Sequence, residues 1–351
     1  MKKILLCIWG IVTLSGCHIY RAYERPDIAV SDSLYRQSTS ITDTTSLASL
    51  SWKELFTDPQ LQQLIEIGLN NNTDLNIAYL KVKEAEALLK TSRLAYLPAI
   101  SLTPQGSISS QDGAKATKTY DLAAAAEWEI DIFGKLLNAK RGAKAALEQS
   151  KAYRQAVQTQ LVATIANSYY SLLMLDEQLD ITRRTAETWN ENVRAMKALK
   201  RAGQTTEMAV AQTEASKLSV DASVLSLEQQ INAMENSLSV LLGMNPQEIG
   251  RSTLDAQVFP DSISTGVPLQ LLSRRPDIRQ SEAALAAAYY ATNEARSAFY
   301  PSITLSGSAG WTNAGGASIS NPGQWLLSAV GSLVQPCLLY TSDAADDTPC
   351  V

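Results

Sequence analysis

The sequence predicts a mixed α and β membrane protein in which a long coiled-coil hairpin of helices is joined to transmembrane β-hairpins. Three observations lead to this fold class. Residues 136–242 keep a helical apolar period without any proline. Residues 99–132 instead alternate apolar and polar side chains with a period of two. The helix, proline and strand pattern of Asp74–Ile108 then returns without a gap at Asp277–Trp311, at an offset of 203 residues (277 − 74).

The first residues predict export and lipid attachment. Two lysines precede an apolar run, residues 4–14, that is too short to span a bilayer. The string Leu14-Ser15-Gly16-Cys17 resembles the lipobox of bacterial lipoproteins, which implies a signal peptide at 1–16 and lipidation of Cys17. His18, rather than an aspartate, follows the cysteine and favours the outer membrane. Residues 17–50 are then expected to be a lipid-anchored extended leader; the alternative is a plain signal peptide that contains a cysteine.

The last residues, 337–351, have no apolar period and resemble the translated sequence of an adapter used in DNA library preparation. We expect a non-native tail there and exclude it from the fold; a natural disordered tail is the alternative. The second repeat stops where a second long hairpin should begin, so the natural protein is expected to be longer, with its own sequence after about residue 336. Because Cys7 lies in the signal peptide and two more cysteines in the tail, no disulfide is expected.

Residues 51–98 predict the N-terminal helices of the first repeat. A short apolar group begins at Trp52, and Asp58-Pro59 is suited to start the next helix. A further helix is expected from about Asp74 to Tyr96. It should end before Pro98, where the apolar period changes from helical to two.

Residues 99–133 predict the first β-barrel hairpin. Apolar residues at every second position are expected to face lipid and the residues between them to face water. Four acids share the water-facing parity and are expected to line the lumen and to favour cations. A soluble sheet edge is the alternative for the strands; a metal site or a general-acid pair is the alternative for the acids, although no histidine lies near them. The lipid-facing set is Ile100, Leu102, Pro104, Gly106, Ile108, Tyr120, Leu122, Ala124, Ala126, Trp128, Ile130 and Ile132, and the acids are Asp121, Glu127, Glu129 and Asp131.

Residues 134–242 predict a long helical hairpin. Apolar residues spaced by three and four form a coiled-coil seam, and the helix before the break would be on the order of 100 Å long. Gly203 is suited to end the first helix, and Thr205 or Thr206 to cap the second. The tip is the part furthest from the strands, so we expect a periplasmic partner to dock there; the alternative is that Gly203 only ends a helix. The tip residues are Arg201, Ala202, Gly203, Gln204, Thr205 and Thr206. The seam contains Tyr153, Val157, Leu161, Ile165, Tyr169, Ala186, Trp189, Val193 and Met196, and then Val220, Val224, Leu227, Ile231, Met234, Leu238 and Leu241.

The second repeat is expected to follow a proline-containing linker at 243–272. A helix is predicted at 273–300 and a second β-barrel hairpin at 301–336. This helix and the one before the linker should together pair with the single long helix. The expected lipid-facing residues of the second hairpin are Ile303, Leu305, Gly307, Ala309 and Trp311, and then Trp325, Leu327, Ala329, Gly331 and Leu333.

Composition and motifs argue against catalysis and against nucleic-acid binding. The formal charge is −5, so nucleic acid is not an expected partner. His18 is the one histidine of the chain, and a serine or cysteine mechanism therefore has no base away from the anchor. The glycine-rich stretch at 310–316 lacks the Gly-Lys-Ser/Thr of a phosphate loop. We expect neither an enzyme nor a cofactor.

Three strings resemble the TolC-type outer-membrane efflux duct family, in particular its lipoprotein branch serving resistance-nodulation-division pumps. They are Trp52-Lys-Glu-Leu-Phe-Thr-Asp-Pro-Gln-Leu61, Trp128-Glu-Ile-Asp-Ile-Phe-Gly134 and Leu271-Leu-Ser-Arg-Arg-Pro-Asp-Ile-Arg279. The resemblance covers residues 52–336 and departs from the family in the absence of a second long hairpin.

The resemblance implies a homotrimer in the outer membrane. Each protomer would give four strands to one barrel, and the helices would form a periplasmic coiled-coil tunnel. The implied function is a passive duct that carries small molecules outward from a periplasmic adaptor and an inner-membrane pump, with adaptor docking at the hairpin tip and with outer-membrane lipid around the barrel. The alternative is a structural or adhesive coiled-coil lipoprotein without a pore.

Overall fold

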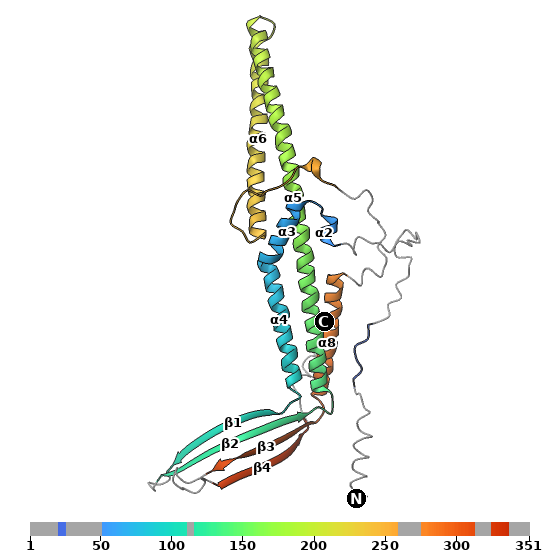
Figure 1. Cartoon of the computed structure of the whole chain (residues 1–351), viewed down its shortest axis with the longest axis vertical. Coiled ribbons are helices and arrows are strands. Elements are labelled where there is room, and N and C mark those ends of the chain that lie inside the picture. Colours follow the sequence, from blue (N-terminus) through green and yellow to red (C-terminus); the bar gives the residue numbers. More distant parts are fainter. Residues whose placement is uncertain (1–19, 26–50, 111–115, 259–274, 313–323, 337–351) are drawn as a thin grey trace, which may run out of the picture. The chain divides into compact units, whose positions relative to one another are not determined.

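The computed structural model describes residues 20–25, 51–110, 116–258, 275–312 and 324–336 (Figure 1). The chain divides into two compact units. The strand unit comprises residues 1–30, 82–151 and 279–351, and the hairpin unit comprises residues 31–81 and 152–278. Helices α4, α5 and α8 contribute residues to both units. The predicted signal peptide, Cys17 and the predicted tail at 337–351 lie outside the described residues.

The hairpin unit is helical throughout its regular structure. Ser51 caps α2 and exchanges hydrogen bonds with Glu54 as a capping box, and Asp58 caps α3 by accepting from the Gln60 backbone N–H at 2.9 Å. The elements are α2 (Trp52–Leu55), α3 (Pro59–Asn71), the start of α4 (Thr73–Leu94), the second part of α5 (Lys135–Arg201), α6 (Glu207–Leu241) and η3 (Leu254–Ala256).

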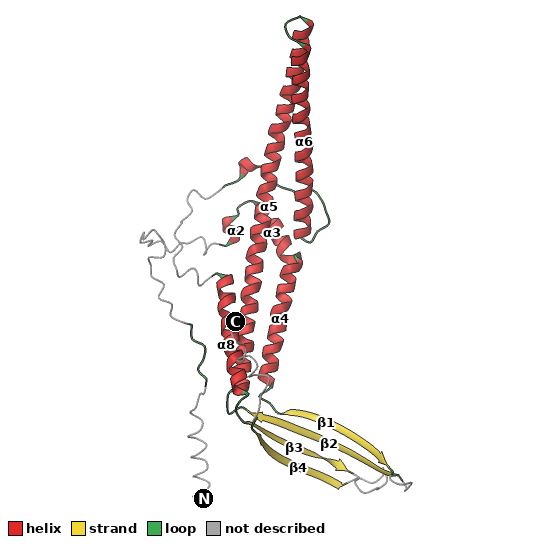
Figure 2. Cartoon of the chain, turned by 180° about the vertical axis from the view of Figure 1, so that it is seen from behind, coloured by secondary structure: helices red, strands yellow, loops and turns green. Residues whose placement is uncertain are grey.

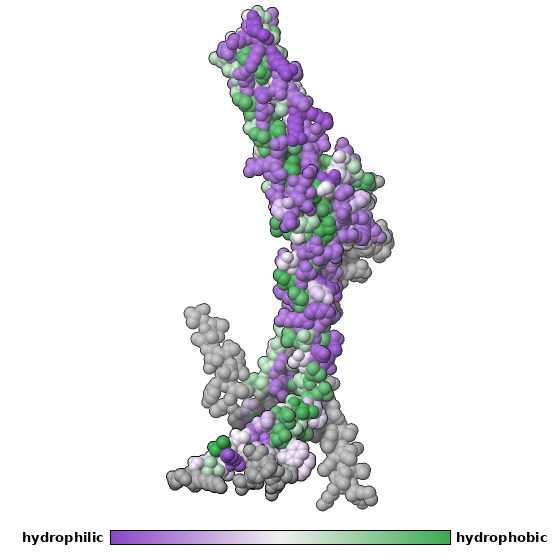
Figure 3. Space-filling view, turned by 60° about the vertical axis from the view of Figure 1, so that its left-hand side comes forward, coloured by the Kyte–Doolittle hydropathy of each residue, from purple (hydrophilic) through white to green (hydrophobic). Residues whose placement is uncertain are grey.

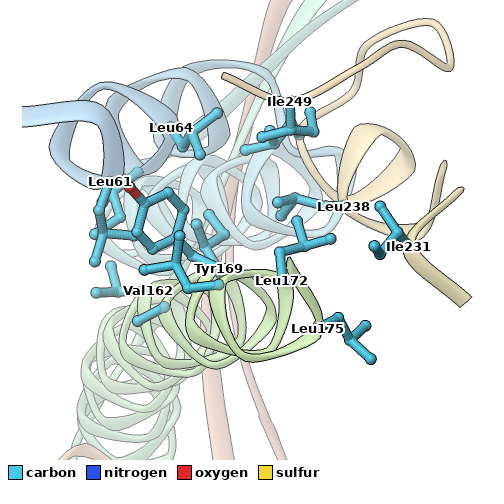
Figure 4. Packing of buried hydrophobic residues seen from close by; sticks show 14 of the residues in the cluster. Leu61, Leu64, Val162, Tyr169, Leu172, Leu175, Ile231, Leu238 and Ile249 are labelled. Atoms are coloured by element: carbon cyan, nitrogen blue, oxygen red, sulfur yellow. The ribbon is translucent and has the colours of Figure 1, made fainter. Parts of the chain in front are cut away.

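The core of the hairpin unit lies where α3, α5, α6 and the segment after α6 meet (Figure 4). Tyr169 is fully buried on α5, with Leu61 of α3 on one side, and Leu238 of α6 is also fully buried. We call this region the hairpin root. Burial of a leucine-sized side chain contributes about 2 kcal/mol, so a cluster of such side chains fixes the start of the hairpin. The cluster contains Leu61, Leu64, Ile65, Leu161, Val162, Ile165, Ala166, Tyr169, Leu172, Leu173, Leu175, Leu179, Leu227, Ile231, Leu238, Leu242 and Ile249.

Beyond the root, the hairpin is a pair of helices held by a narrower seam. Ala186, Trp189, Val193 and Met196 are half-buried, while most of their neighbours on α5 are exposed. The predicted three-and-four spacing therefore marks the side of α5 that packs. The hairpin surface in Figure 3 is mostly hydrophilic, with hydrophobic residues scattered along it.

The strand unit joins three helical segments to a sheet. The second part of α4 packs on the first part of α5 through Val82, Ala85, Leu89 and Leu147. Helix α8 (Pro276–Ser297) packs on the same part of α5, where a Cβ on Gly142 would lie 3.5 Å from Tyr290.

The leader segment, residues 20–25, lies along α8. The backbone N–H of Tyr23 donates to the Tyr290 hydroxyl at 3.0 Å, and the Tyr289 hydroxyl donates to the carbonyl of Arg21 at 3.2 Å. The rings of Tyr23 and Tyr289 lie 5.8 Å apart. The predicted leader is therefore ordered over these residues and belongs to the strand unit.

The sheet has four antiparallel strands in the order β1-β2-β3-β4 (Figure 2). These are β1 (Ala99–Ser109), β2 (Thr117–Ile130), β3 (Ser302–Thr312) and β4 (Gln324–Val334). Both bounds of β3 and both bounds of α8 lie 203 residues after those of β1 and α4, so the repeat offset read from the sequence is confirmed.

Some predicted bounds differ from the observed ones by a few residues. Helix α4 ends at Leu94 rather than Tyr96, because a turn with hydrogen bonds from Tyr96 and Leu97 leads into the proline. Helix α8 begins at Pro276 rather than at 273. Proline is favoured at the first position of a helix, because its fixed φ suits the helix and its missing N–H would be unpaired there anyway. In the described part of the chain, no helix has the length and apolarity needed to cross a membrane.

Candidate functional site

The two faces of the sheet carry different chemistry. Directly paired residues in an antiparallel sheet share a face, so the register decides whether the predicted lipid-facing residues come together. They do in all three strand pairs: Leu102 pairs with Ala124, Leu122 with Trp311, and Trp311 with Trp325. We call this the apolar face. It is defined by Ile100, Leu102, Pro104, Gly106, Ile108, Tyr120, Leu122, Ala124, Ala126, Trp128, Ile130, Ile303, Leu305, Gly307, Ala309, Trp311, Trp325, Leu327, Ala329, Gly331 and Leu333.

Large side chains of the apolar face are exposed. Ile100 and Leu327 are both 78% exposed, an unusual value for aliphatic side chains in a regular sheet. Trp311 and Trp325 meet with their ring centroids 4.5 Å apart. A continuous apolar surface of this size with aromatic residues near its end is typical of a sheet in contact with lipid.

The opposite face, which we call the polar face, carries rows of hydroxyl groups. Ser107 and Thr119 share a hydrogen bond of 2.6 Å, and Ser308 and Ser328 share one of 2.7 Å. In each pair the two hydroxyl groups satisfy each other's hydrogen bonding, and the side chains on this surface are small. Gly310 also belongs to this face, and any Cβ there would lie 2.6 Å from the Cα of Ala123, so β2 and β3 approach too closely for a larger residue.

Three of the four predicted lumen acids lie on the polar face. Asp121 is paired with Gln105 and Thr312, Glu127 with Ala99 and Ser306, and Glu129 with Thr304. Glu127 is exposed and, among the described residues, has no ion pair. Glu129 is different because Lys135 lies 2.8 Å from its carboxylate.

Asp131 lies one residue beyond the end of β2. Its Oδ2 accepts a hydrogen bond of 2.7 Å from the backbone N–H of Leu137 in the first turn of α5. A carboxylate at this place satisfies a free N–H and interacts favourably with the helix dipole. The alternation in the sequence extends through Asp131, but the residue serves the junction between strand and helix. Its expected role in the lumen stays a prediction, as do the roles of the other three acids.

The hairpin tip is a tight turn that ends α5 and starts α6. Gly203 has a φ of 73°, and the backbone N–H groups of Gly203 and Gln204 donate to the carbonyls of Lys200 and Leu199 at 3.0 and 2.9 Å. This is the Schellman pattern, in which glycine takes the left-handed position. Thr206 caps α6 by accepting from the Ala209 backbone N–H at 3.3 Å, so the cap is Thr206 rather than Thr205.

Ion pairs across the hairpin hold the tip together. Lys200 pairs with Glu207, and Lys197 pairs with Glu214 at 2.7 Å. Arg201, Ala202, Gly203 and Gln204 are exposed, and no heavy atom lies within 4 Å of a Cβ built on Gly203. The structure thus gives the tip an open surface of small and polar side chains.

Sequence reasoning missed the polar contacts that fasten the hairpin root. Arg251 binds Asp176 of α5 through two nitrogens and lies 2.5 Å from Glu235 of α6, which is only 6% exposed. Hydrogen bonds to Asp176 outweigh burial and raise the pKa of Arg251 above its ordinary value. An arginine inside a linker gave little sign of this, because its two partners lie 75 and 16 residues away.

Asp58 is the centre of a second cluster at the root. Its Oδ2 accepts hydrogen bonds from the Tyr169 hydroxyl at 2.6 Å, from Gln257 Nε2 at 2.8 Å and from the Ser252 hydroxyl. Burial alone would raise the pKa of Asp58, but these donors, Ser252 first, lower it to about 2. The sequence identified Asp58 as a helix start and gave no sign of its partners.

The comparisons with known proteins agree with this geometry. The chain matches the family model described as outer membrane efflux protein over residues 64–244 and 267–340. It is 30% identical over 326 residues to the toluene efflux pump outer membrane protein TtgF of Pseudomonas putida, covering 88% of this chain and 68% of that protein. The chain belongs to the outer membrane efflux protein family.

Other members of the outer membrane efflux protein family are similarly close. The probable outer membrane lipoprotein SilC of Salmonella typhimurium is 31% identical over 335 residues, which is 92% of this chain and 72% of SilC. The outer-membrane channel OprN (27% identity) and the open state of the Neisseria gonorrhoeae MtrE channel (28% identity) each superpose with a TM-score of 0.80 and cover 94% of this chain and 75% of theirs. The chain thus spans about two thirds to three quarters of the length of these relatives.

These findings confirm the family, the fold class and the outer-membrane location that the sequence predicted. They also confirm the function at the level of the family: the protein is an outer-membrane channel component of an efflux system. The family is one of channels rather than enzymes. The alternative of a lipoprotein without a pore finds no support among these relatives.

Proposed function

We propose that the complete protein is a passive duct formed by a homotrimer. The register of the sheet carries this proposal, because it brings the predicted lipid-facing residues of all four strands together on one face. In a closed barrel of four strands from each protomer, the apolar face would contact outer-membrane lipid and the polar face would line water. Cys17 would be lipidated and hold the N-terminus at the membrane; mass spectrometry showing an unacylated mature N-terminus would contradict this part.

The duct would need neither a cofactor nor a catalytic residue. Energy would come from an inner-membrane pump, linked to the tip by a periplasmic adaptor. The relatives are named for cargo as different as toluene and pyoverdine. Such variety fits a wide aqueous path that does not bind its cargo, and we infer that this chain carries small molecules without a strong cargo site.

The lumen assignment can be tested by reversal-potential measurements on the full-length protein in planar bilayers. The pair Asp121→Asn with Glu127→Gln removes two carboxylates of the polar face, and we expect it to lower the preference for cations. Asp131→Asn removes one carboxylate at the helix start, where it accepts a hydrogen bond from the Leu137 backbone N–H, and we expect it to lower the preference less than the pair does. Loss of preference only in the Asp131 variant, or absence of conductance in the unchanged protein, would contradict the proposal.

The adaptor would dock on the tip, Arg201–Thr206, because small and polar side chains there allow another helical hairpin to approach. Gly203→Glu should abolish efflux in cells while trimer content and single-channel conductance stay intact. If efflux persists, the tip is only a turn.

A further inference from the structure

A hollow of about 460 Å³ in the strand unit lies between α5, α8 and the leader. Two helical stripes form its walls. Arg141, Lys144 and Ala145 are spaced three and four apart on α5, as are Ala283, Ala286 and Tyr290 on α8. The three alanines leave the space open because they have no side chain to fill it, and Tyr23 of the leader lines it as well.

The charges around the hollow are predominantly positive. Its charged lining residues are Arg141, Lys144, Arg279, Glu148 and Glu282. Both acids are already engaged, since Glu148 pairs with Lys151 at 2.9 Å and Glu282 pairs with Arg25 at 3.5 Å. Each of these acids is thus balanced by a cation, and Arg141 and Lys144 add two positive charges in a chain whose formal charge is −5. An anionic ligand would find a favourable potential here.

Arg141 has a buried nitrogen, Nη1, without a hydrogen-bond partner in the described part of the chain. The guanidinium lies over the ring of Tyr290, 6.0 Å from the centroid. A guanidinium N–H that is shielded from water without an acceptor costs free energy, so an acceptor oxygen placed beside Arg141 would be stabilised. Lys144, one turn further, is exposed on the same stripe and has no ion pair in the described part of the chain.

One end of the hollow lies close to the junction between the helices and the strands. Tyr290 lies seven residues before the end of α8 at Ser297, and Arg141 six residues after the start of α5 at Lys135. By helix rise, these residues are about 10 Å from the junction with the strands. The headgroup region of a bilayer extends roughly 5–8 Å beyond the hydrocarbon on each side. Helical side chains tilt toward the N-terminus of their helix, so the long side chain of Arg141 extends toward the strands and spans the remaining few ångströms to a phosphate of the inner leaflet.

We propose that this hollow binds the phosphate group of an anionic membrane phospholipid. The phosphate would lie between Arg141 and Lys144, and the glycerol part of the lipid would lie against Tyr290 and the alanines. The leader would complete the site, since Tyr23 lines it and Arg25 occupies Glu282. The proposal rests on the apolar face lying in the membrane, but it does not depend on conduction or on the adaptor.

The test measures phospholipid retained by the delipidated full-length protein, using native mass spectrometry after addition of phosphatidylglycerol or phosphatidylcholine. We expect the protein to retain phosphatidylglycerol in preference to phosphatidylcholine. The pair Arg141→Gln with Lys144→Gln should weaken that retention about tenfold, because hydrogen bonds to charged groups are lost. The matched control pair is Lys90→Gln with Arg93→Gln, two exposed cations on α4 that lose the same charge and should retain the lipid.

Two further arms separate the alternatives. Ala286→Leu fills the hollow without changing any charge and should also reduce retention, whereas Arg141→Lys should largely preserve it. Equal retention by the pocket pair and the control pair would overturn the proposal. Displacement of the lipid by millimolar inorganic phosphate alone would show a simple anion site and overturn the assignment to phospholipid. A loss of trimer in the pocket pair, with or without lipid, would show that a second copy of the chain covers this groove instead.

Discussion

The two helices of the hairpin each end in a turn of the same type, but the two turns lie in different surroundings. Helix α5 ends at Gly203 and α6 at Gly243, with φ values of 73° and 68° and the same pair of backbone hydrogen bonds. A Cβ on Gly203 would meet no heavy atom within 4 Å, whereas one on Gly243 would lie 3.0 Å from the carbonyl oxygen of Asn71. Local sequence is thus enough to produce the turn, but only the packing around it decides what a substitution costs.

The same contrast extends along the whole hairpin. At the root, Ile165, Tyr169 and Leu238 are fully buried and Arg251 holds two carboxylates. Towards the tip, the seam is half-buried and the ion pairs are exposed; Arg194 and Glu191 are each more than 70% exposed. We infer that the root supplies most of the stability of the hairpin.

Removing the buried ion pair should have the largest effect. Arg251→Ala leaves Glu235 buried without its cation, which should cost about 3–5 kcal/mol of unfolding free energy. The matched change at an exposed pair, Arg194→Ala, should cost no more than about 0.5 kcal/mol. Hydrogen exchange of the α6 backbone in the full-length protein measures both. Equal protection in the two variants would show that the root does not hold the hairpin.

The two glycines offer a smaller and better-matched comparison. Gly203→Ala should cost about 1 kcal/mol, because alanine must take the left-handed conformation. Gly243→Ala adds to that strain a forced movement of Asn71, so we expect about 2–3 kcal/mol. Chemical denaturation followed by circular dichroism would rank the two variants. A cost at Gly203 as large as that at Gly243 would mean that the tip is packed in the complete protein.

Acid should weaken the root through Asp58 by a small amount. Its pKa of about 2 in the folded protein lies below the ordinary value of 3.8, so its contribution to stability is complete above about pH 4 and is lost as the pH falls towards 2. Because the carboxylate is only partly shielded from water, we expect a change on the order of 1 kcal/mol. Denaturation of the unchanged protein at pH 5, 4, 3 and 2 should show this loss, and Asp58→Asn should show less of it. Identical pH profiles would contradict the role of Asp58.

Patterns with a short period were enough to predict most of the regular structure. The alternation from Ile100 onward depends only on which side of a strand each residue occupies, so it predicted the membership of the apolar face in all four strands. The repeat offset predicted that α8 and β3 follow α4 and β1 by 203 residues, because the same helix, proline and strand order recurs. Gly203 predicted the end of α5, since few other residues adopt its backbone conformation.

Contacts between distant residues could not be predicted in this way. Asp131 continues the alternation of β2, yet it binds the first turn of α5 instead of extending the strand. The attachment of the leader to Tyr289 and Tyr290 joins residues more than 260 positions apart. Neither follows from a local period, because several acids and tyrosines in the chain have equivalent local surroundings.

The sequence by itself determined the elements, the two faces of the sheet, the repeat and the family, because each depends on periodicity or on strings of adjacent residues. The tertiary structure alone decided the partners of Arg251 and Asp58, the close approach at Gly310 and the cationic hollow at Arg141. These features depend on which side chains meet after the chain has folded back on itself. Their energies come from burial and from charges brought together, and a one-dimensional pattern contains neither.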